Sequence, residues 1–368
     1  MYYSNHHPAT KIEVRDIGLY RNELVIPDQT LGSNGWKNSP THTYLKQGLP
    51  PETKINLPTD TNNYDQETVS TILETFQDLA RHDRVLPIIA WYYAAPLRPY
   101  IEEFSEGVGF HHLSVTSAHE DSTKLLLATL CRSFGMSGKP YPVTSFNTLV
   151  GALSATNGIP VWLHRYKPNE LTNDQLDDIH RQLERAATID IILGPDINNQ
   201  TDIHVHRSPC VISGDQSLQD PTARQWVIET DVETDVETEA DEISTRLRGL
   251  FGDVRPDTES DLPQTVPHPN QHALAYYQFL TSLNTEVVCS AWQWAREQTH
   301  HVLSEQISPE QYTTEITRKV GLKGIQTVAF GFEMHTRFVE SLDDSSTLLS
   351  EDVLNNALRY LVRRKLHM

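Results

Sequence analysis

Short apolar runs alternate with helix-like segments between residues 112 and 230, and this alternation limits the possible folds more than any other feature. Apolar runs typical of buried strands lie at 112–116, 159–163, 209–213 and 226–230. Helical patterns lie at 123–134, 145–154 and 173–187, and a hairpin-like pair lies at 189–193 and 203–206. Because strands separated by helices form parallel sheets, the alternation predicts an α/β core with a mostly parallel sheet.

The segments that flank this core predict other structures. Apolar residues on both sides of an Arg21-Asn22 turn predict an N-terminal β-hairpin, whereas residues 28–65 are rich in Pro, Asn, Thr and Gly and predict a loop or linker. Helical spacing predicts helices from about Asp65, over residues 85–93, and from Gln271 onwards. We expect four parts: 1–64 a hairpin and linker, 65–252 the core with its preceding helices, 253–270 a linker, and 271–368 a C-terminal helical region.

The chain is strongly acidic. Its 30 basic and 49 acidic residues give a formal net charge of −19, and twenty of the basic residues are arginines. This composition resembles that of proteins from salt-loving archaea and their viruses, in which concentrated salt screens the repulsion between surface carboxylates. The acidity argues against a broad surface for nucleic acid, so we expect any DNA contact to be local and built from a few arginines.

Several classes of protein are disfavoured by what the sequence lacks. No run approaches the roughly 20 apolar residues of a membrane helix, and residues 1–11 lack a signal-peptide core, so we expect a cytoplasmic protein without membrane contact. Cys131, Cys210 and Cys289 form no CxxC pair and predict free thiols. The seventeen histidines show no complete ligand spacing, which predicts no metal site.

The C-terminal region holds two further patterns. Four aromatic residues at helical spacing are expected in the core rather than as base-stacking platforms: Tyr276, Tyr277, Trp292 and Trp294. The basic cluster Arg363-Arg364-Lys365 predicts a solvated helix end, where cations interact favourably with the helix dipole. A contact with a phosphate or a partner protein remains the alternative for this cluster.

The segment between the strand at 112–116 and the next helix has the position of a phosphate-binding loop. In the pattern G-x-x-x-x-G-K-[ST], backbone N–H groups surround the phosphates, the lysine reaches them, and the hydroxyl holds Mg²⁺. In the corresponding segment both glycines are replaced, by Ser117 and Ser122, while Thr123 takes the lysine position and Lys124 the hydroxyl position. Serine resists the positive φ angles and the close phosphate approach that glycine permits.

Charge around this segment also disfavours catalysis. Glu120 and Asp121 add negative charge where a triphosphate would lie, although the flexible Lys124 is able to swing toward a phosphate. His164 and Arg165 follow the strand at 159–163, where P-loop ATPases place acids that hold magnesium and orient water. Neither is a hard oxygen ligand for magnesium. We therefore predict an inactive ATPase, and leave open both a site without ligand and weak binding of ATP, with or without Mg²⁺.

Four sequence blocks resemble those of one family. Residues 86–96, 113–135, 153–168 and 208–215 resemble helicase-like P-loop ATPases of archaeal viruses, plasmids and integrated elements, which are often fused to primase–polymerase domains. The resemblance extends over about residues 12–340. It implies a P-loop NTPase core of the RecA/AAA-like kind, action on DNA, and assembly into rings whose subunits share nucleotide sites.

The resemblance also suggests roles for single residues. In this family the second core strand is followed by Asp-Glu-Tyr-Lys, of which this chain keeps only Tyr166 and Lys167. The strand at 209–213 is followed by Gly-Glu in the family, which gives Asp215 a sensor-like position. Arg224 is the nearest candidate for an arginine finger that reaches the nucleotide of a neighbouring subunit, displaced by about one residue.

Three hypotheses follow. The first is a degenerate helicase-like homologue, a pseudo-ATPase, that serves as an assembly or regulatory subunit in DNA replication or maintenance of a mobile element. Its expected partners are DNA, a primase or an active ATPase paralogue, within a homo- or hetero-oligomer. The second is an active ATPase or helicase with a rearranged P-loop that uses Lys124. The third is a non-enzymatic structural scaffold.

Overall fold

A computed structural model of the chain describes most of its residues. The described ranges are 11–14, 16–45, 55–59, 61–104, 109–116, 120–137, 140–142, 146–188, 191–195, 201–205, 207–214, 216, 218, 227–231, 244–248, 268–307, 322–343 and 347–367. Three of the expected site residues lie outside these ranges: Ser117, Asp215 and Arg224. Most of the expected linker at 253–270 lies outside them as well.

A five-stranded sheet in the order β13-β7-β12-β9-β8 forms the centre of the core, and every neighbouring pair is parallel. The strands are β7 (His112–Thr116), β8 (Tyr141–Pro142), β9 (Val161–Tyr166), β12 (Cys210–Gly214) and β13 (Val227–Asp231). The predicted parallel α/β sheet is therefore confirmed. Strand β8 was not expected, because it is only two residues long and contains a proline, which the edge of a sheet tolerates.

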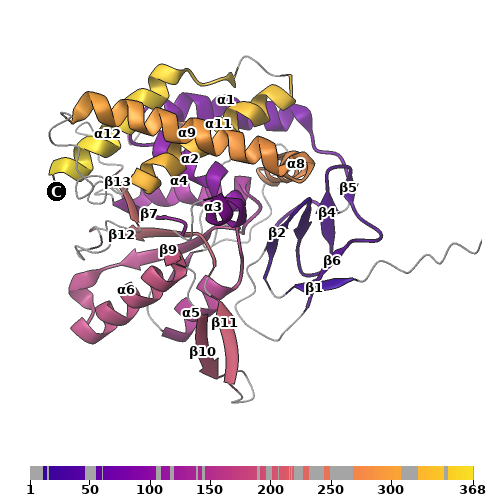
Figure 1. The fold of residues 1–368 in the computed structure, drawn as a ribbon, viewed down its shortest axis with the longest axis horizontal. Helices are drawn as coiled ribbons and strands as arrows, with labels where there is room; N and C mark the ends of the chain where they lie inside the picture. The colour runs from indigo at the N-terminus through magenta and orange to yellow at the C-terminus, as the bar shows by residue number, and fades with distance from the viewer. Residues whose placement is uncertain are drawn as a thin grey trace, which may run out of the picture.

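Helices cover both faces of this sheet (Figure 1). Helix α4 (Glu120–Ser133) lies on one face, and α5 (Phe146–Ser154) and α6 (Asn173–Thr188) lie on the other. Strand residues alternate between two hydrophobic clusters, with Val211 facing α4 and Ile212 facing the opposite layer. A two-stranded antiparallel hairpin, β10 (Ile191–Pro195) with β11 (Thr201–Val205), extends beyond this layer, as the sequence predicted.

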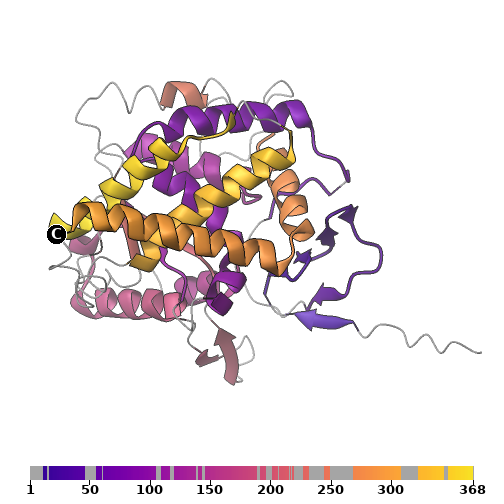
Figure 2. The same ribbon diagram turned by 45° about the horizontal axis from the view of Figure 1, so that its top comes forward.

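The C-terminal residues form the predicted helical region, which packs over the α4 face. Its helices are α8 (Asn270–Ser282), α9 (Thr285–Gln306), α11 (Leu322–Ser341) and α12 (Glu351–His367). They pack with α1 (Gln66–Ala80) and α2 (Leu86–Ala94), and Figure 2 shows the orange and yellow C-terminal helices crossing the purple ones. All nine residues of α2 are buried, as expected for a helix that is apolar all round.

One glycine permits a close contact between two helices of this layer. A Cβ atom on Gly331 of α11 would lie 1.8 Å from the backbone oxygen of Ala90 in α2. Only a residue without a side chain allows this approach of two backbones. The expected core aromatics also lie here: Tyr276, Tyr277 and Trp292 are buried, and Trp294 is partly buried against the same cluster.

The end of α12 differs from the prediction. Arg364 pairs with Asp231 of β13, and the buried Lys365 donates a hydrogen bond of 2.8 Å to the backbone oxygen of Val227. The expected solvated helix end is therefore wrong for these two cations, because α12 crosses the edge strand of the sheet and its last turns are packed. Only Arg363 among the three is exposed.

The N-terminal residues form small sheets beside the core. A four-stranded antiparallel sheet contains β2 (Gly18–Tyr20), β3 (Glu23–Val25), β4 (Thr30–Gly32) and β5 (Gly35–Trp36). The predicted hairpin at Arg21-Asn22 is confirmed by the β2–β3 pairing. Strand β1 (Ile12–Val14) pairs in parallel with β6 (His42–Tyr44). The prediction that residues 28–65 form a loop or linker is wrong for β4 to β6, which are too short to show a clear alternation.

Cys131 and Cys210 are buried free thiols, and Cys289 is partly exposed. Helix α3 (Arg98–Phe104) was not expected, and its first residue, Arg98, is buried in an ion pair with Glu102. Across the described ranges, no helix combines the length and the apolar character needed to span a membrane.

Candidate nucleotide site at the carboxyl edge of the sheet

The carboxyl ends of the parallel strands meet at one edge of the sheet. Thr116, the last residue of β7, pairs with Gly214 of β12 and with Asp231 of β13. Helix α4 begins at Glu120, which leaves residues 117–119 between strand and helix. Ligands of open α/β sheets bind outside the carboxyl ends of the strands. The sequence segment proposed as a degenerate phosphate loop thus lies at the edge where a ligand is expected.

The helix begins earlier than the sequence predicted. We expected a turn through Ser122 and a helix from Thr123, but α4 starts at Glu120 and both residues lie in its first turn. Two acidic residues at a helix N-terminus interact favourably with the helix dipole, and serine, unlike glycine, does not interrupt the helix. Both Ser122 and Thr123 are buried.

The two buried hydroxyls have different surroundings. Ser122 Oγ lies 2.9 Å from Ser244 Oγ, within hydrogen-bond distance. Thr123 Oγ1 is buried and has no hydrogen-bond partner among the residues that the structure describes. Thr123 stands at the position of the phosphate-binding lysine, so this position offers a neutral, buried hydroxyl in place of an exposed positive charge.

Lys124 is paired within its own helix. Its Nζ lies 2.8 Å from Glu120 Oε1, one turn earlier. The same carboxylate oxygen lies 3.3 Å from Nε2 of His164 on β9, without the alignment of a hydrogen bond. The hydrogen bond from Lys124 is the main cause of a lowered pKa of Glu120, so this carboxylate remains ionised at neutral pH. A negative charge therefore occupies the space between α4 and the end of β9.

His164 is held in its neutral form. Trp162 Nε1 donates a hydrogen bond of 2.8 Å to Ser213 Oγ, and His164 Nδ1 lies 3.0 Å from the same oxygen. The serine hydroxyl is then able to donate to Nδ1, which places the ring proton on Nε2, facing Glu120. Burial, with the charge of Lys124, lowers the pKa of His164 to about 4. The side chain at the expected position of a catalytic acid is therefore neutral and hydrogen-bonded to the sheet.

Arg165 lies in an irregular position of β9. Ser213 of β12 pairs with His164 and the next residue, Gly214, pairs with Tyr166, so Arg165 is left out of the ladder. Its φ of 61° is rare for a residue with a side chain and is typical of a β-bulge. The bulge leaves Arg165 exposed at the carboxyl edge, where it offers a positive charge but no ligand for a divalent cation.

The described residues at this edge do not form a magnesium site. Mg²⁺ needs near-octahedral oxygen ligands and is usually bound through carboxylates. At the end of β9 the nearby described carboxylate is Glu120, which is already paired with Lys124. Within the described ranges no group of three His, Cys, Asp or Glu side chains is placed to hold a metal ion. The described residues of this edge therefore do not fit the metal that a P-loop ATPase requires.

The structure brings two of the residues that the sequence selected, Lys124 and His164, against the same carboxylate of Glu120, while Ser122 and Thr123 lie in the first turn of the same helix as Lys124. Sequence reasoning missed the two residues that fix His164, namely Trp162 and Ser213. The alternation of β9 shows that Trp162 and His164 share one face of the strand. It does not show which residue of β12 lies beside them, because that depends on the register between strands far apart in the sequence.

The architecture of the chain resembles that of a solved helicase. The structure described as "SCCmec type IV Cch - active helicase" aligns with a TM-score of 0.54 at 12% sequence identity, covering 96% of this chain and 60% of that protein. This chain thus spans less than two thirds of that helicase. A second structure, the apo C-terminal region of NrS-1 (residues 305–718), aligns with a TM-score of 0.27 at 12% identity, too low to support an argument.

The similarity to the Cch helicase shows the fold alone. The sequence matches no protein-family model and no curated protein. The expected helicase-like architecture is supported by the similarity to Cch, which extends over nearly all of this chain, including its helical C-terminal region. At 12% identity the similarity carries no information on which residues act.

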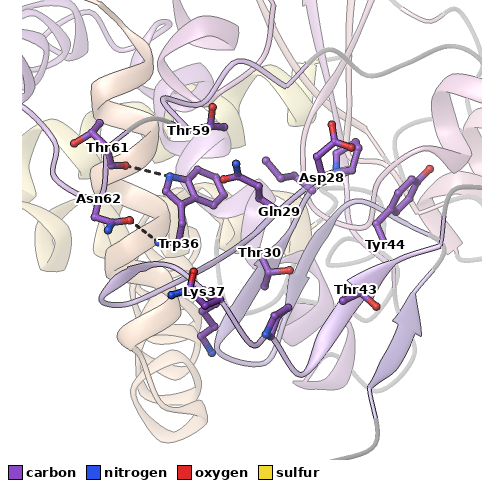
Figure 3. A pocket seen from close by; sticks show the side chains of 14 residues that line it. Asp28, Gln29, Thr30, Trp36, Lys37, Thr43, Tyr44, Thr59, Thr61 and Asn62 are labelled. Carbon is purple, nitrogen blue, oxygen red and sulfur yellow. Dashed lines mark hydrogen bonds between the residues drawn. The ribbon is translucent and has the colours of Figure 1, made fainter.

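A hollow of about 610 Å³ lies on the N-terminal β-sheet (Figure 3). The indole nitrogen of Trp36 donates to the backbone oxygens of Pro58 and Thr61, each at 3.1 Å. Its backbone nitrogen donates to Asn62 Oδ1 at 2.9 Å. The polar atoms of Trp36 thus hold Pro58, Thr61 and Asn62 against the sheet. Lys37, which also lines the hollow, is paired with Glu23 at 2.7 Å, so this region is built for structure.

Proposed function

We propose that this chain is a helicase-like ATPase homologue that has lost hydrolysis and serves as an assembly or regulatory subunit. The process that we propose for it is DNA replication or maintenance of a mobile element, as the resemblance of its sequence blocks implies. The observation that carries the loss of hydrolysis is the contact between Glu120, Lys124 and His164 at the carboxyl edge of the sheet. In the proposed alignment, Thr123, Lys124 and His164 stand where phosphoryl transfer needs a lysine, a hydroxyl and an acid, and the contact adds the negative charge of Glu120 beside them.

Phosphoryl transfer places specific demands on the residues around the phosphates. Catalysis of this reaction consists almost entirely of positioning and of neutralising charge with a metal ion and cationic groups. A neutral His164 is unable to orient water as a carboxylate does, and Arg165 binds no magnesium. Glu120 adds a negative charge beside the place of the phosphates. Loss of the metal ligands matters more than the displacement of the lysine, because no other described group supplies them.

One observation favours a second candidate, an active ATPase with a rearranged loop. The Lys124–Glu120 pair spans one helical turn, and both side chains are partly exposed. Such pairs contribute only about 0.3–0.5 kcal/mol, less than the thermal energy RT. Lys124 is therefore free to leave Glu120 for a triphosphate. In this candidate the metal would have to be held by the nucleotide and water alone.

Solution mass with and without DNA tests the proposed role. We expect the purified chain, in molar KCl, to form an oligomer or to bind single-stranded DNA in light scattering coupled to gel filtration. We also expect no release of phosphate from ATP beyond the blank, with or without DNA. A monomer whose mass does not change with DNA contradicts the proposed subunit role and favours the structural scaffold.

A further inference from the structure

A pocket of about 670 Å³ lies between the C-terminal helices and the turn that joins α1 to α2. Four of its eight lining residues are arginines, and only one is acidic. The residues are Arg84, Arg359, Arg363, Arg364, Asp83, Gln306, Asn356 and Tyr360. This concentration of cations stands out in a chain that carries 49 acidic residues against 30 basic ones.

Two of the arginines share one carboxylate. Arg84 Nη1 lies 3.0 Å from Asp231 Oδ1, and Arg364 pairs with the other oxygen of Asp231. Arg84 also lies over the ring of Tyr360, with its guanidinium carbon 5.9 Å from the ring centre. Asp231 is the last residue of β13, so this end of the pocket adjoins the carboxyl edge of the sheet.

The other two arginines lie on the outer face of α12. Arg359 donates to Glu305 Oε2 of α9 through Nε and Nη2, at 3.1 and 2.9 Å. Arg363, one turn later, is exposed and donates to the neutral amide oxygen of Gln306 at 3.2 Å. In the described ranges no carboxylate is paired with Arg363. Among the four arginines of the pocket, its charge is therefore the most accessible to an anion.

The inner arginine lacks a full set of partners. Arg364 Nε is buried and has no hydrogen-bond partner within the part of the chain that the structure describes. Burial lowers the pKa of Arg364 and the charge of Arg84 lowers it further, while Glu229 opposes this effect. A buried donor without a partner destabilises the folded chain. An anion with several oxygens, entering the pocket, would supply acceptors to this crowded group.

We propose that this arginine pocket binds the phosphate groups of a nucleic-acid strand. Guanidinium groups match phosphate oxygens in a bidentate manner, which makes arginine well suited to this ligand. Asn356, Arg359 and Arg363 are spaced by three and four residues and so form a row along one face of α12. A row of donors suits successive phosphates of a strand better than a single small anion. The proposal rests on the proposed function, because it supplies the local DNA contact that an acidic helicase-like chain requires.

Fluorescence anisotropy tests the proposed binding of a nucleic-acid strand to the arginine pocket. A labelled single-stranded oligonucleotide is titrated with the full chain over a series of KCl concentrations. We expect the double substitution Arg359→Gln/Arg363→Gln to weaken binding about tenfold and to reduce the slope of log K against log [KCl] by about 2. The control is Arg181→Gln, an exposed arginine of α6 that is ion-paired with Asp178 at 3.4 Å. We expect this control to bind as the unchanged chain does.

The outcomes separate this proposal from the proposed function. Absence of binding by the unchanged chain overturns the DNA role and the pocket proposal together. Equal binding by the unchanged chain and the double variant overturns the pocket proposal alone. A loss of binding in Arg181→Gln as large as that in the double variant also overturns the pocket proposal alone. ATP or inorganic phosphate that binds the pocket as tightly as the oligonucleotide overturns a nucleic-acid ligand. If the double variant melts at a lower temperature, the exposed single substitution Arg363→Gln is tested in its place. We expect it to reduce the slope of log K against log [KCl] by about 1.

Discussion

Glu120 and Lys124 form an ion pair of 2.8 Å at the start of α4, and the same Glu120 oxygen lies 3.3 Å from His164 Nε2 on β9. The first helix after β7 is thereby connected to the strand that would carry the catalytic acid. The contact places an anion where the proposed alignment puts the phosphates of a nucleotide. We regard this relationship as the main physical reason to propose a fold that has lost hydrolysis.

The first prediction concerns the protonation of His164. Its folded pKa of about 4 lies below the usual 6.5, mainly through burial and next through the charge of Lys124. We expect Lys124→Met to raise this pKa and Glu120→Gln to lower it, because Glu120 favours the protonated ring. NMR titration of the imidazole carbon resonances measures both shifts. Equal pKa values in the two variants would show that this contact does not exist in solution.

The second prediction concerns acid stability of the helical layer. Burial lowers the pKa of His272 to about 4 and that of His335 to about 3, both below the unfolded value of 6.5. The unfolded chain therefore binds more protons between pH 6.5 and pH 3–4, so stability is complete above pH 6.5 and falls below it. Tyr93 O–H lies 2.7 Å from His272 Nε2, which fixes the neutral ring.

His335 offers the direct test of this pH dependence. Neither of its ring nitrogens has a hydrogen-bond partner in the described part of the chain. We expect His335→Leu to reduce the loss of unfolding free energy between pH 6.5 and pH 4, measured by urea denaturation at each pH. The exposed His268→Ala serves as the control and should keep the slope of the unchanged chain. A steeper slope in His335→Leu contradicts the assignment.

The third prediction concerns Glu23 in the N-terminal sheet. Burial alone would raise its pKa, but hydrogen bonds from Lys37 Nζ and from the backbone of Thr41 and His42 lower it to about 2. The stability that ionised Glu23 contributes to the folded chain is present above the unfolded pKa of 4.5. It is lost as pH falls from 4.5 toward 2. We expect Glu23→Gln to cost about 1.5–3 kcal/mol at pH 7. Thermal or urea unfolding at pH 7 that is unchanged in this variant contradicts the network.

The fourth prediction concerns the backbone contact between α2 and α11. A Cβ on Gly331 would lie 1.8 Å from the oxygen of Ala90, so Gly331→Ala should destabilise the chain by about 1–3 kcal/mol or more. The matched control is Gly324→Ala in the same helix, whose Cβ would meet side-chain atoms, with Cγ1 of Ile228 at 2.9 Å and Cδ2 of His111 at 3.2 Å. We expect the control to change unfolding free energy much less. Similar losses in both variants would contradict the packing of the two helices.

The sequence predicts the elements of this fold better than their arrangement. Buried strands such as the predicted one at 159–163 are apolar and followed by polar residues, so their existence follows from the residues. The short strands β4 to β6 were missed, because two or three residues cannot show an alternation. The packing of α12 on β13 was missed too, since Arg363-Arg364-Lys365 has the composition of a solvated helix end.

The candidate site was predictable only in part. The strand–helix context of Lys124 and the position of His164 follow from local pattern, and both lie at the carboxyl edge of the sheet. Their connection through Glu120, and the hydrogen bonds of Ser213, depend on the register between separate strands and on the start of α4. Those are tertiary properties, which local spacing does not contain.

The central claim is that the chain has lost ATP hydrolysis. It is tested most directly by measuring phosphate release from ATP by the purified chain in molar KCl, with magnesium and single-stranded DNA present. Comparison with Lys124→Ala and with the control Arg181→Gln distinguishes a true turnover from a contaminant. The account predicts that all three proteins release phosphate at the rate of the blank. Turnover in the unchanged chain and in Arg181→Gln that disappears in Lys124→Ala would contradict it and establish an active, rearranged phosphate loop.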